Sequence, residues 1–139
     1  MFVRTKKIKG KEYAYLVRNK WTSKGSRQKV DKYLGRIKKG QRIRENSYVV
    51  DETKDFNTTI QELIKHELSN HNITDKEIKV ITMNEGFLCK KTIQDLLNLK
   101  WGKERADKEG ERLAIALLES GLKVKETEFE KLFELWKNQ

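Results

Sequence analysis

Residues 2–37 read FVRTKKIKGKEYAYLVRNKWTSKGSRQKVDKYLGRI, and this stretch decides the front part of the 139-residue chain. Two breaks that contain glycine, at 9–10 and 23–26, divide it into three runs rich in β-branched and aromatic residues, at 2–8, 12–21 and 27–37. Short breaks of this kind join neighbouring antiparallel strands in β-hairpins. The stretch therefore predicts a three-stranded antiparallel β-sheet.

Alternation along the middle run predicts two different faces, because successive side chains of a strand point to opposite sides. One face would carry Tyr13, Tyr15, Val17, Asn19 and Trp21, and the other Glu12, Ala14, Leu16, Arg18 and Lys20. In the third run Val30, Lys32 and Leu34 alternate with Lys29, Asp31 and Tyr33. We expect one more apolar face and one that mixes cations with aromatic rings.

The positive charge of the chain is concentrated in the same region. The first 44 residues contain 16 Lys and Arg but only two acidic residues, Glu12 and Asp31, a net charge of +14. The other 95 residues contain 15 basic and 19 acidic residues, a net −4, and the two parts together give the +10 of the whole chain. Aromatic residues interspersed among so many cations are typical of a surface that contacts a polyanion, and nucleic acid is the leading candidate.

Two kinds of contact are expected from this surface. Lys and Arg release condensed counterions from phosphates, whereas aromatic rings stack on bases and amides such as Asn19 or Gln28 donate to adenine in a major groove. The predicted nucleic-acid-binding residues are Arg4, Lys6, Lys7, Lys9, Lys11, Tyr13, Tyr15, Arg18, Lys20, Trp21, Lys24, Arg27, Gln28, Lys29, Lys32, Arg36, Arg42 and Arg44. The alternative is that Tyr13, Tyr15 and Trp21 pack on the rest of the protein and the cations are simply solvated.

Helical spacing replaces alternation in the second part of the chain. Apolar residues recur at i, i+3 and i+4 in 60–68 and again in 129–136, which predicts amphipathic helices and a C-terminal helical bundle. The predicted fold class is therefore α+β, with a basic three-stranded sheet module at 1–44, a helical domain at 45–139 and a linker at about 38–56. The apolar stripe of the last helix leaves core packing, a homodimer or another protein partner open as its role.

The segment 74–99 is ambiguous. A capping box at 74–77 favours a helix across 78–81, although the β-branched run at 79–82 also fits a strand. A helix-turn-helix remains open here, with Lys90, Lys91, Thr92 and Gln94 at the start of its second helix.

Several other functions find no support in the residues. His66, His71 and Cys89 do not have the spacing of a zinc site, and no serine or cysteine lies in a recognisable nucleophile motif. We therefore expect no metal, no cofactor and no enzymatic activity. A single cysteine, the lack of a signal-peptide pattern and the lack of a run of roughly 18 apolar residues predict a cytoplasmic protein without a membrane partner, nucleoid-associated if the source is prokaryotic.

Three pieces of the basic stretch also carry a family resemblance. Residues 1–17, the run Arg27-Gln28-Lys29-Val30 and the run Tyr33-Leu34-Gly35-Arg36-Ile37 resemble the N-terminal segment of insertion-sequence transposases of the DDE type. The resemblance covers about 37 residues and implies a module that engages DNA. It carries over no catalytic residue, because the chain is too short to include the ribonuclease-H-like catalytic domain.

These observations together predict a non-enzymatic DNA-binding protein, regulatory or chromosome-associated, whose basic sheet contacts duplex DNA. The helical domain would support the sheet or mediate assembly. The alternatives are an RNA- or ribosome-associated factor, since the same charges suit A-form RNA, and an accessory subunit of a transposition-type complex.

Overall fold

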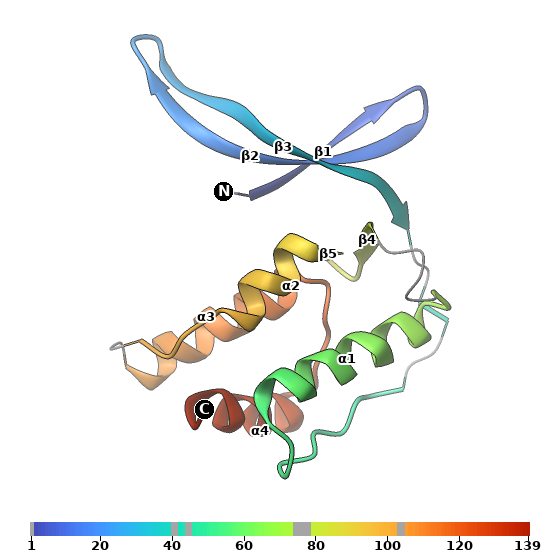
Figure 1. Ribbon diagram of the computed structural model, residues 1–139, viewed down its shortest axis with the longest axis vertical. Coiled ribbons are helices and arrows are strands. Elements are labelled where there is room, and N and C mark those ends of the chain that lie inside the picture. The colour runs from blue at the N-terminus through green and yellow to red at the C-terminus, as the bar shows by residue number, and fades with distance from the viewer. Residues whose placement is uncertain (1, 40–41, 44–45, 74–78, 103–104) are drawn as a thin grey trace.

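A computed structural model describes residues 2–39, 42–43, 46–73, 79–102 and 105–139 of the chain. It contains one mixed five-stranded sheet, in the order β1–β2–β3–β4–β5, and four helices (Figure 1). The strands are β1 Phe2–Ile8, β2 Lys11–Thr22, β3 Gly25–Lys39, β4 Val80–Met83 and β5 Gly86–Cys89. The helices are α1 Phe56–Asn70, α2 Lys90–Leu97, α3 Ala106–Glu119 and α4 Glu126–Lys137. The predicted α+β class is confirmed, but the sheet has two strands more than the three that were predicted.

Glycine and a two-residue loop explain the first hairpin. Ile8 pairs with Lys11, so that Lys9 and Gly10 alone form the turn, and both have positive φ angles, of 51° and 80°. This conformation matches the twist of antiparallel strands and favours glycine. The second hairpin pairs Thr22 with Gly25 and is equally tight.

The β2–β3 pairing contains two irregularities, between Ala14 and Tyr15 and between Leu16 and Val17. An extra residue in one strand increases the local twist and interrupts strict alternation. Ala14, Leu16 and Val17 are all buried, although alternation places Val17 on the face opposite to the other two.

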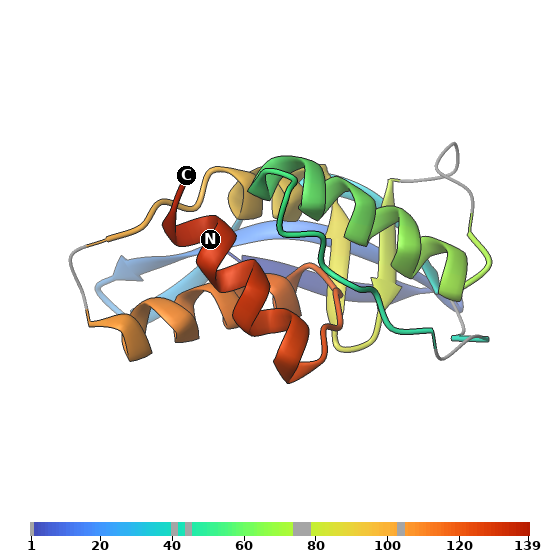
Figure 2. The same ribbon diagram turned by 90° about the horizontal axis from the view of Figure 1, so that it is seen from below.

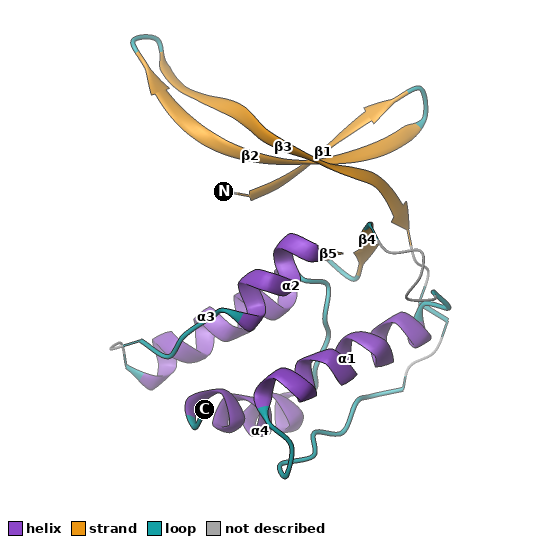
Figure 3. Cartoon of the chain, in the orientation of Figure 1, coloured by secondary structure: helices purple, strands orange, loops and turns teal. Residues whose placement is uncertain are grey.

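The helices all cover one side of the sheet (Figures 2 and 3). They enclose the main core together with β4 and β5, and Phe56, Leu88 and Trp136 are each no more than 1% exposed there. The opposite side of the β1–β3 meander is covered by no helix. None of the described helices has the length and apolar character needed to cross a membrane.

The meander joins the helical part through a narrow junction. Ile37, Lys38 and Lys39 at the end of β3 pair in parallel with β4, and a small cluster of Ala14, Ile37, Val80 and Cys89 is buried beneath. One sheet therefore continues across the boundary at residue 44 that was predicted to separate two domains.

The structure corrects the helical prediction for 78–81. Residues 80–83 form β4, residues 86–89 form β5, and Asn84 and Glu85 make the turn between them, with Asn84 at a φ of 53°. β-branched Val80 and Ile81 are almost fully buried, and pairing with β3 outweighs the local helix signal. A hairpin followed by α2 replaces the helix-turn-helix, and the capping box at 74–77 lies outside the described residues.

Candidate nucleic-acid interface

The basic side chains of the meander are all exposed to solvent. Fourteen Lys and Arg lie in residues 2–39 and none of them is buried: Arg4, Lys6, Lys7, Lys9, Lys11, Arg18, Lys20, Lys24, Arg27, Lys29, Lys32, Arg36, Lys38 and Lys39. The two carboxylates of these strands each bind one cation, Asp31 to Arg18 at 3.0 Å and Glu12 to Lys39 at 2.9 Å. A large excess of exposed positive charge therefore remains on this part of the sheet.

The far half of the β2–β3 hairpin projects as an arm. β1 begins at Phe2, which pairs with Val17 of β2. Residues 18–29 therefore lie beyond β1 and are paired only with each other, and we call them the hairpin arm. Figure 1 shows the hairpin arm extending past the end of β1 and away from the helices. It carries five cations and no acidic residue, and Trp21 near its tip is 82% exposed.

Like charges face each other across the hairpin arm. Arg18 pairs with Lys29 and Lys20 pairs with Arg27 in the register of β2 and β3. Like charges directly opposite each other destabilise a sheet. Arg18 has Asp31 as a partner, but no ion pair involves Lys20 or Arg27 in the part of the chain that the structure describes. An anion lying across the hairpin arm would remove this repulsion.

The tyrosines lie on the side of the sheet that the helices leave open. The ring of Tyr33 is 6.3 Å from that of Tyr13 and 5.3 Å from that of Tyr15. Ala14, which lies between Tyr13 and Tyr15 in the strand, points to the opposite side, into the small buried cluster. Neither these rings nor Trp21 form part of the helical core, so the alternative in which they pack on the helical half does not describe this structure.

The two arginines that follow the meander differ from the rest. Nη1 of Arg42 donates to the buried carboxylate of Glu67 at 3.0 Å, and the Arg42 side chain is only 17% exposed. Asn84 donates to the same carboxylate at 3.2 Å, so that this group ties the connector, α1 and the β4–β5 turn together. Arg42 therefore has a structural role and lies apart from the exposed patch, and Arg44 lies outside the described residues.

Three lysines from beyond residue 44 lie close to the meander. Lys79, Lys90 and Lys91 line a cleft of about 740 Å³ between β3 and the start of α2, which also includes Lys32. The sequence placed Lys90 and Lys91 at the start of a helix but gave no sign that this helix meets β3. No pattern in the sequence indicated that Lys79 belongs to a basic surface.

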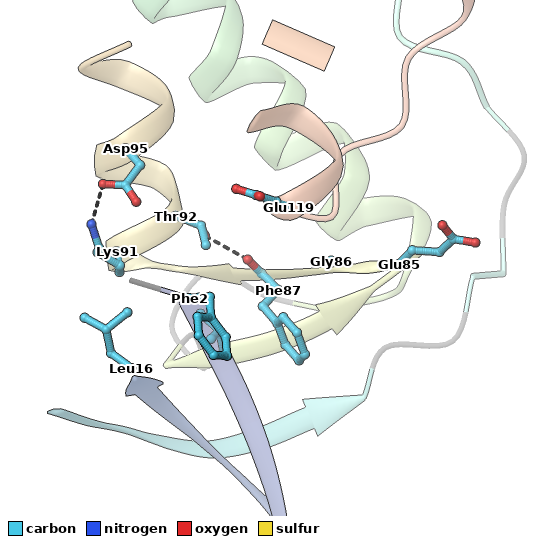
Figure 4. A pocket seen from close by; sticks show the side chains of 10 residues that line it. Phe2, Leu16, Glu85, Gly86, Phe87, Lys91, Thr92, Asp95 and Glu119 are labelled. Atoms are coloured by element: carbon cyan, nitrogen blue, oxygen red, sulfur yellow. Dashed lines mark hydrogen bonds and ion pairs between the residues drawn. The ribbon is translucent and has the colours of Figure 1, made fainter. Parts of the chain in front are cut away.

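A second hollow lies nearby and has the opposite character (Figure 4). It measures about 230 Å³, and its described lining includes three carboxylates, those of Glu85, Asp95 and Glu119, and one cation, Lys91. Lys91 binds Asp95 at 2.6 Å, as the dashed line in Figure 4 marks. This hollow is unsuited to phosphate, and we do not include it in the candidate interface.

Metal-ligand residues are scattered through the described ranges, where no three His, Cys, Asp or Glu side chains come together as a possible metal site. Nε2 of His66 lies 2.8 Å from the carbonyl of Asn46, and Cys89 is buried beneath the sheet. In the described part of the chain, the polar side chains that do cluster are the cations of the sheet.

Comparisons with family models, with curated proteins and with solved structures each find no match for this chain. The resemblance of residues 1–37 to transposase N-terminal segments therefore stays a prediction, and the functional argument depends on the geometry of the sheet.

Proposed function

We propose that this protein binds nucleic acid, with duplex DNA as the favoured ligand, and that it does so without catalysis through the β1–β3 meander. The observation that carries the proposal is the set of fourteen exposed cations on the three strands of the meander and their two turns, which hold only two carboxylates. Neutralising phosphates with such a surface releases counterions and supplies most of the affinity of non-specific binding.

The shape of the hairpin arm favours duplex DNA as the ligand. A two-stranded β-ribbon fits the major groove of B-DNA, which is about 12 Å wide. Asn19 and Gln28 face each other across the hairpin arm, and Arg4 donates a hydrogen bond to the Gln28 side chain. The two amides can donate to and accept from base edges, while the cations of the hairpin arm contact phosphates on either side.

The helical half serves as the support of the sheet in this proposal. Its net charge of −4 is opposite to that of the meander, so that the protein presents one basic face. A regulatory or chromosome-associated role in the cytoplasm follows from the same proposal. Assembly through the helices and the accessory-subunit alternative are tested by the mass of the native complex.

The test is a titration of a labelled DNA duplex with the intact protein, followed by fluorescence anisotropy over a series of salt concentrations. We expect the logarithm of the binding constant to fall linearly with the logarithm of the salt concentration. Competition with duplex RNA and with single strands of the same length then ranks the ligands. Binding that does not change with salt, or no binding to any of these nucleic acids, would overturn the proposal.

A further inference from the structure

We propose that the cleft between β3 and α2 holds the phosphate backbone of one nucleic-acid strand, on the side of the hairpin arm that faces the helices. This inference rests on the proposed function and extends it. It assigns a role to Lys79 and Lys90, which lie outside the basic stretch, and it says where the phosphate backbone of one strand of the ligand lies.

The lining of the cleft has the chemistry that a phosphate backbone requires. Of the ten lining residues that the structure describes, four are lysines and none is acidic. Lys91 is bound to Asp95, but no ion pair involves Lys32, Lys79 or Lys90 among the residues with described positions. Three cationic groups from separate segments thus converge on one cleft, and no described carboxylate pairs with them.

The floor of the cleft is apolar and ordered. Leu16, Leu34 and Ile93 lie between the lysines, and Leu16 is only 8% exposed. Gly35 lies in β3 at a φ of 134°, and a Cβ at this position would be 3.5 Å from the Cβ of Lys79. The aliphatic part of the Lys79 side chain therefore packs along the backbone of β3. This contact brings the ammonium group of a lysine from the helical half to the sheet.

The hairpin arm and the cleft form one continuous basic track. Lys32 pairs with Leu16, which lines the cleft, while Lys29 pairs with Arg18 and Arg27 with Lys20. Residues opposite each other share a face, so Arg27, Lys29 and Lys32 lie on the side of β3 that faces the helices. A strand that follows this row from the tip of the hairpin arm reaches Lys79 and Lys90 next.

The acidic hollow sets the limit of this track. It shares Leu16 and Lys91 with the cleft, but its carboxylates, those of Glu85, Asp95 and Glu119, repel phosphate. A nucleic-acid strand is therefore expected to leave the cleft on the side of Lys79 rather than to run past the start of β1.

The open side of the sheet offers a weaker site. A hollow of about 280 Å³ lies there and is lined by Arg4, Lys6 and Tyr15, but also by Val17 and Val30. Among its described lining residues the cations, Arg4 and Lys6, both come from β1, and those from β2 and β3 are uncharged. The cleft surrounds a strand with charges from two sides, which a single face cannot do.

The experiment compares two double variants of the intact protein. K79Q/K90Q removes the two cleft charges that come from the helical half, and K65Q/K123Q removes two exposed charges that lie outside the meander and outside the cleft. Both variants lower the net charge equally, and both change exposed side chains, so circular dichroism should report unchanged folding. Anisotropy titrations with the same labelled duplex over a salt series give the slope of log binding constant against log salt.

We expect K79Q/K90Q to reduce the magnitude of that slope by about 1.8, because each phosphate contact contributes roughly 0.9. K65Q/K123Q should leave the slope within about 0.5 of the unmodified protein. K79R/K90R keeps the charges and should bind as the unmodified protein does, which separates loss of charge from loss of local structure.

The outcomes distinguish the two proposals. If the unmodified protein binds with a steep salt dependence but K79Q/K90Q has the same slope as it, the cleft proposal is wrong and the proposed function stands. An equal loss in both double variants means that only total charge matters, and this also overturns the cleft. Failure of the unmodified protein to bind any duplex overturns the proposed function itself.

Discussion

Reversal of two charges in the hairpin arm should make the protein more stable and a weaker binder at the same time. Arg27 and Lys29 lie directly opposite Lys20 and Arg18. The variant R27E/K29E turns two repulsive cross-strand pairs into two attractive ones. Each opposite-charge pair of this kind stabilises a sheet by about 0.2 to 1 kcal/mol at low salt. A small rise in melting temperature is therefore expected.

Binding should change in the other direction and by more. Each lost phosphate contact reduces the slope of log binding constant against log salt by about 0.9. Two contacts therefore account for a roughly 60-fold gain in affinity between 1 M and ~0.1 M salt, which the variant would lose. New repulsion between the introduced carboxylates and phosphates adds to this loss. We therefore expect R27E/K29E to bind a DNA duplex at least this much more weakly than the unmodified protein.

The assay measures thermal unfolding and duplex binding on the same samples. Lys65 and Lys123 are exposed lysines of the helical half, so K65E/K123E is a matched control that also lowers the net charge from +10 to +6. The control should bind only slightly more weakly than the unmodified protein. Equal losses in R27E/K29E and the control would refute the idea that the hairpin arm is in contact with the ligand.

Three further changes separate stability from binding. W21A should leave the melting temperature unchanged, because Trp21 is 82% exposed, but should weaken binding by about 1 to 3 kcal/mol if the ring stacks on a base; equal anisotropy curves would exclude this contact. G86A should lower the free energy of unfolding in denaturant by about 3 kcal/mol, since a Cβ there would meet the carbonyl of Leu118, whereas G110A is tolerated and tests the specificity of the effect. The N–H of Val50 donates to Glu128 at 2.6 Å, and this hydrogen bond lowers the pKa of the Glu128 carboxyl below its ordinary value of 4.5. The stability that the ionised carboxylate contributes is therefore present above pH 4.5 and is lost as the pH falls through the lowered pKa. E128Q should therefore be less stable near neutral pH by about 1 kcal/mol and should lose less stability in acid, and parallel pH profiles of unfolding would contradict this.

The β1–β3 meander could be predicted from the sequence, because the residue patterns that predict its strands and turns are local. Gly10 and Gly25 mark the two turns, and the runs that they separate are rich in β-branched and aromatic residues. The predicted strand limits of 2–8, 12–21 and 27–37 differ from the observed ones by at most two residues. The exposure of the basic side chains was also expected from the concentration of positive charge in residues 1–44.

The remaining features depend on contacts between distant residues, and local patterns cannot reveal them. Val80 and Ile81 form a strand because the end of β3 offers a free edge, which the capping signal at 74–77 does not report. Gly86 allows β5 to approach the end of α3 closely, a requirement that only the packed structure makes visible. Lys79 and Lys90 join the basic surface for the same reason, because α2 and the residue before β4 are brought next to β3 by the parallel pairing.

The central claim is that the hairpin arm contacts nucleic acid, and lysine modification of the intact protein tests it most directly. The protein is acetylated with and without a saturating DNA duplex, and the reactivity of each lysine is measured by mass spectrometry. We predict that Lys20, Lys24 and Lys29 lose reactivity when the duplex is bound, while Lys65 and Lys123 keep theirs. Protection of the helical-half lysines with no change in the hairpin arm would contradict the account.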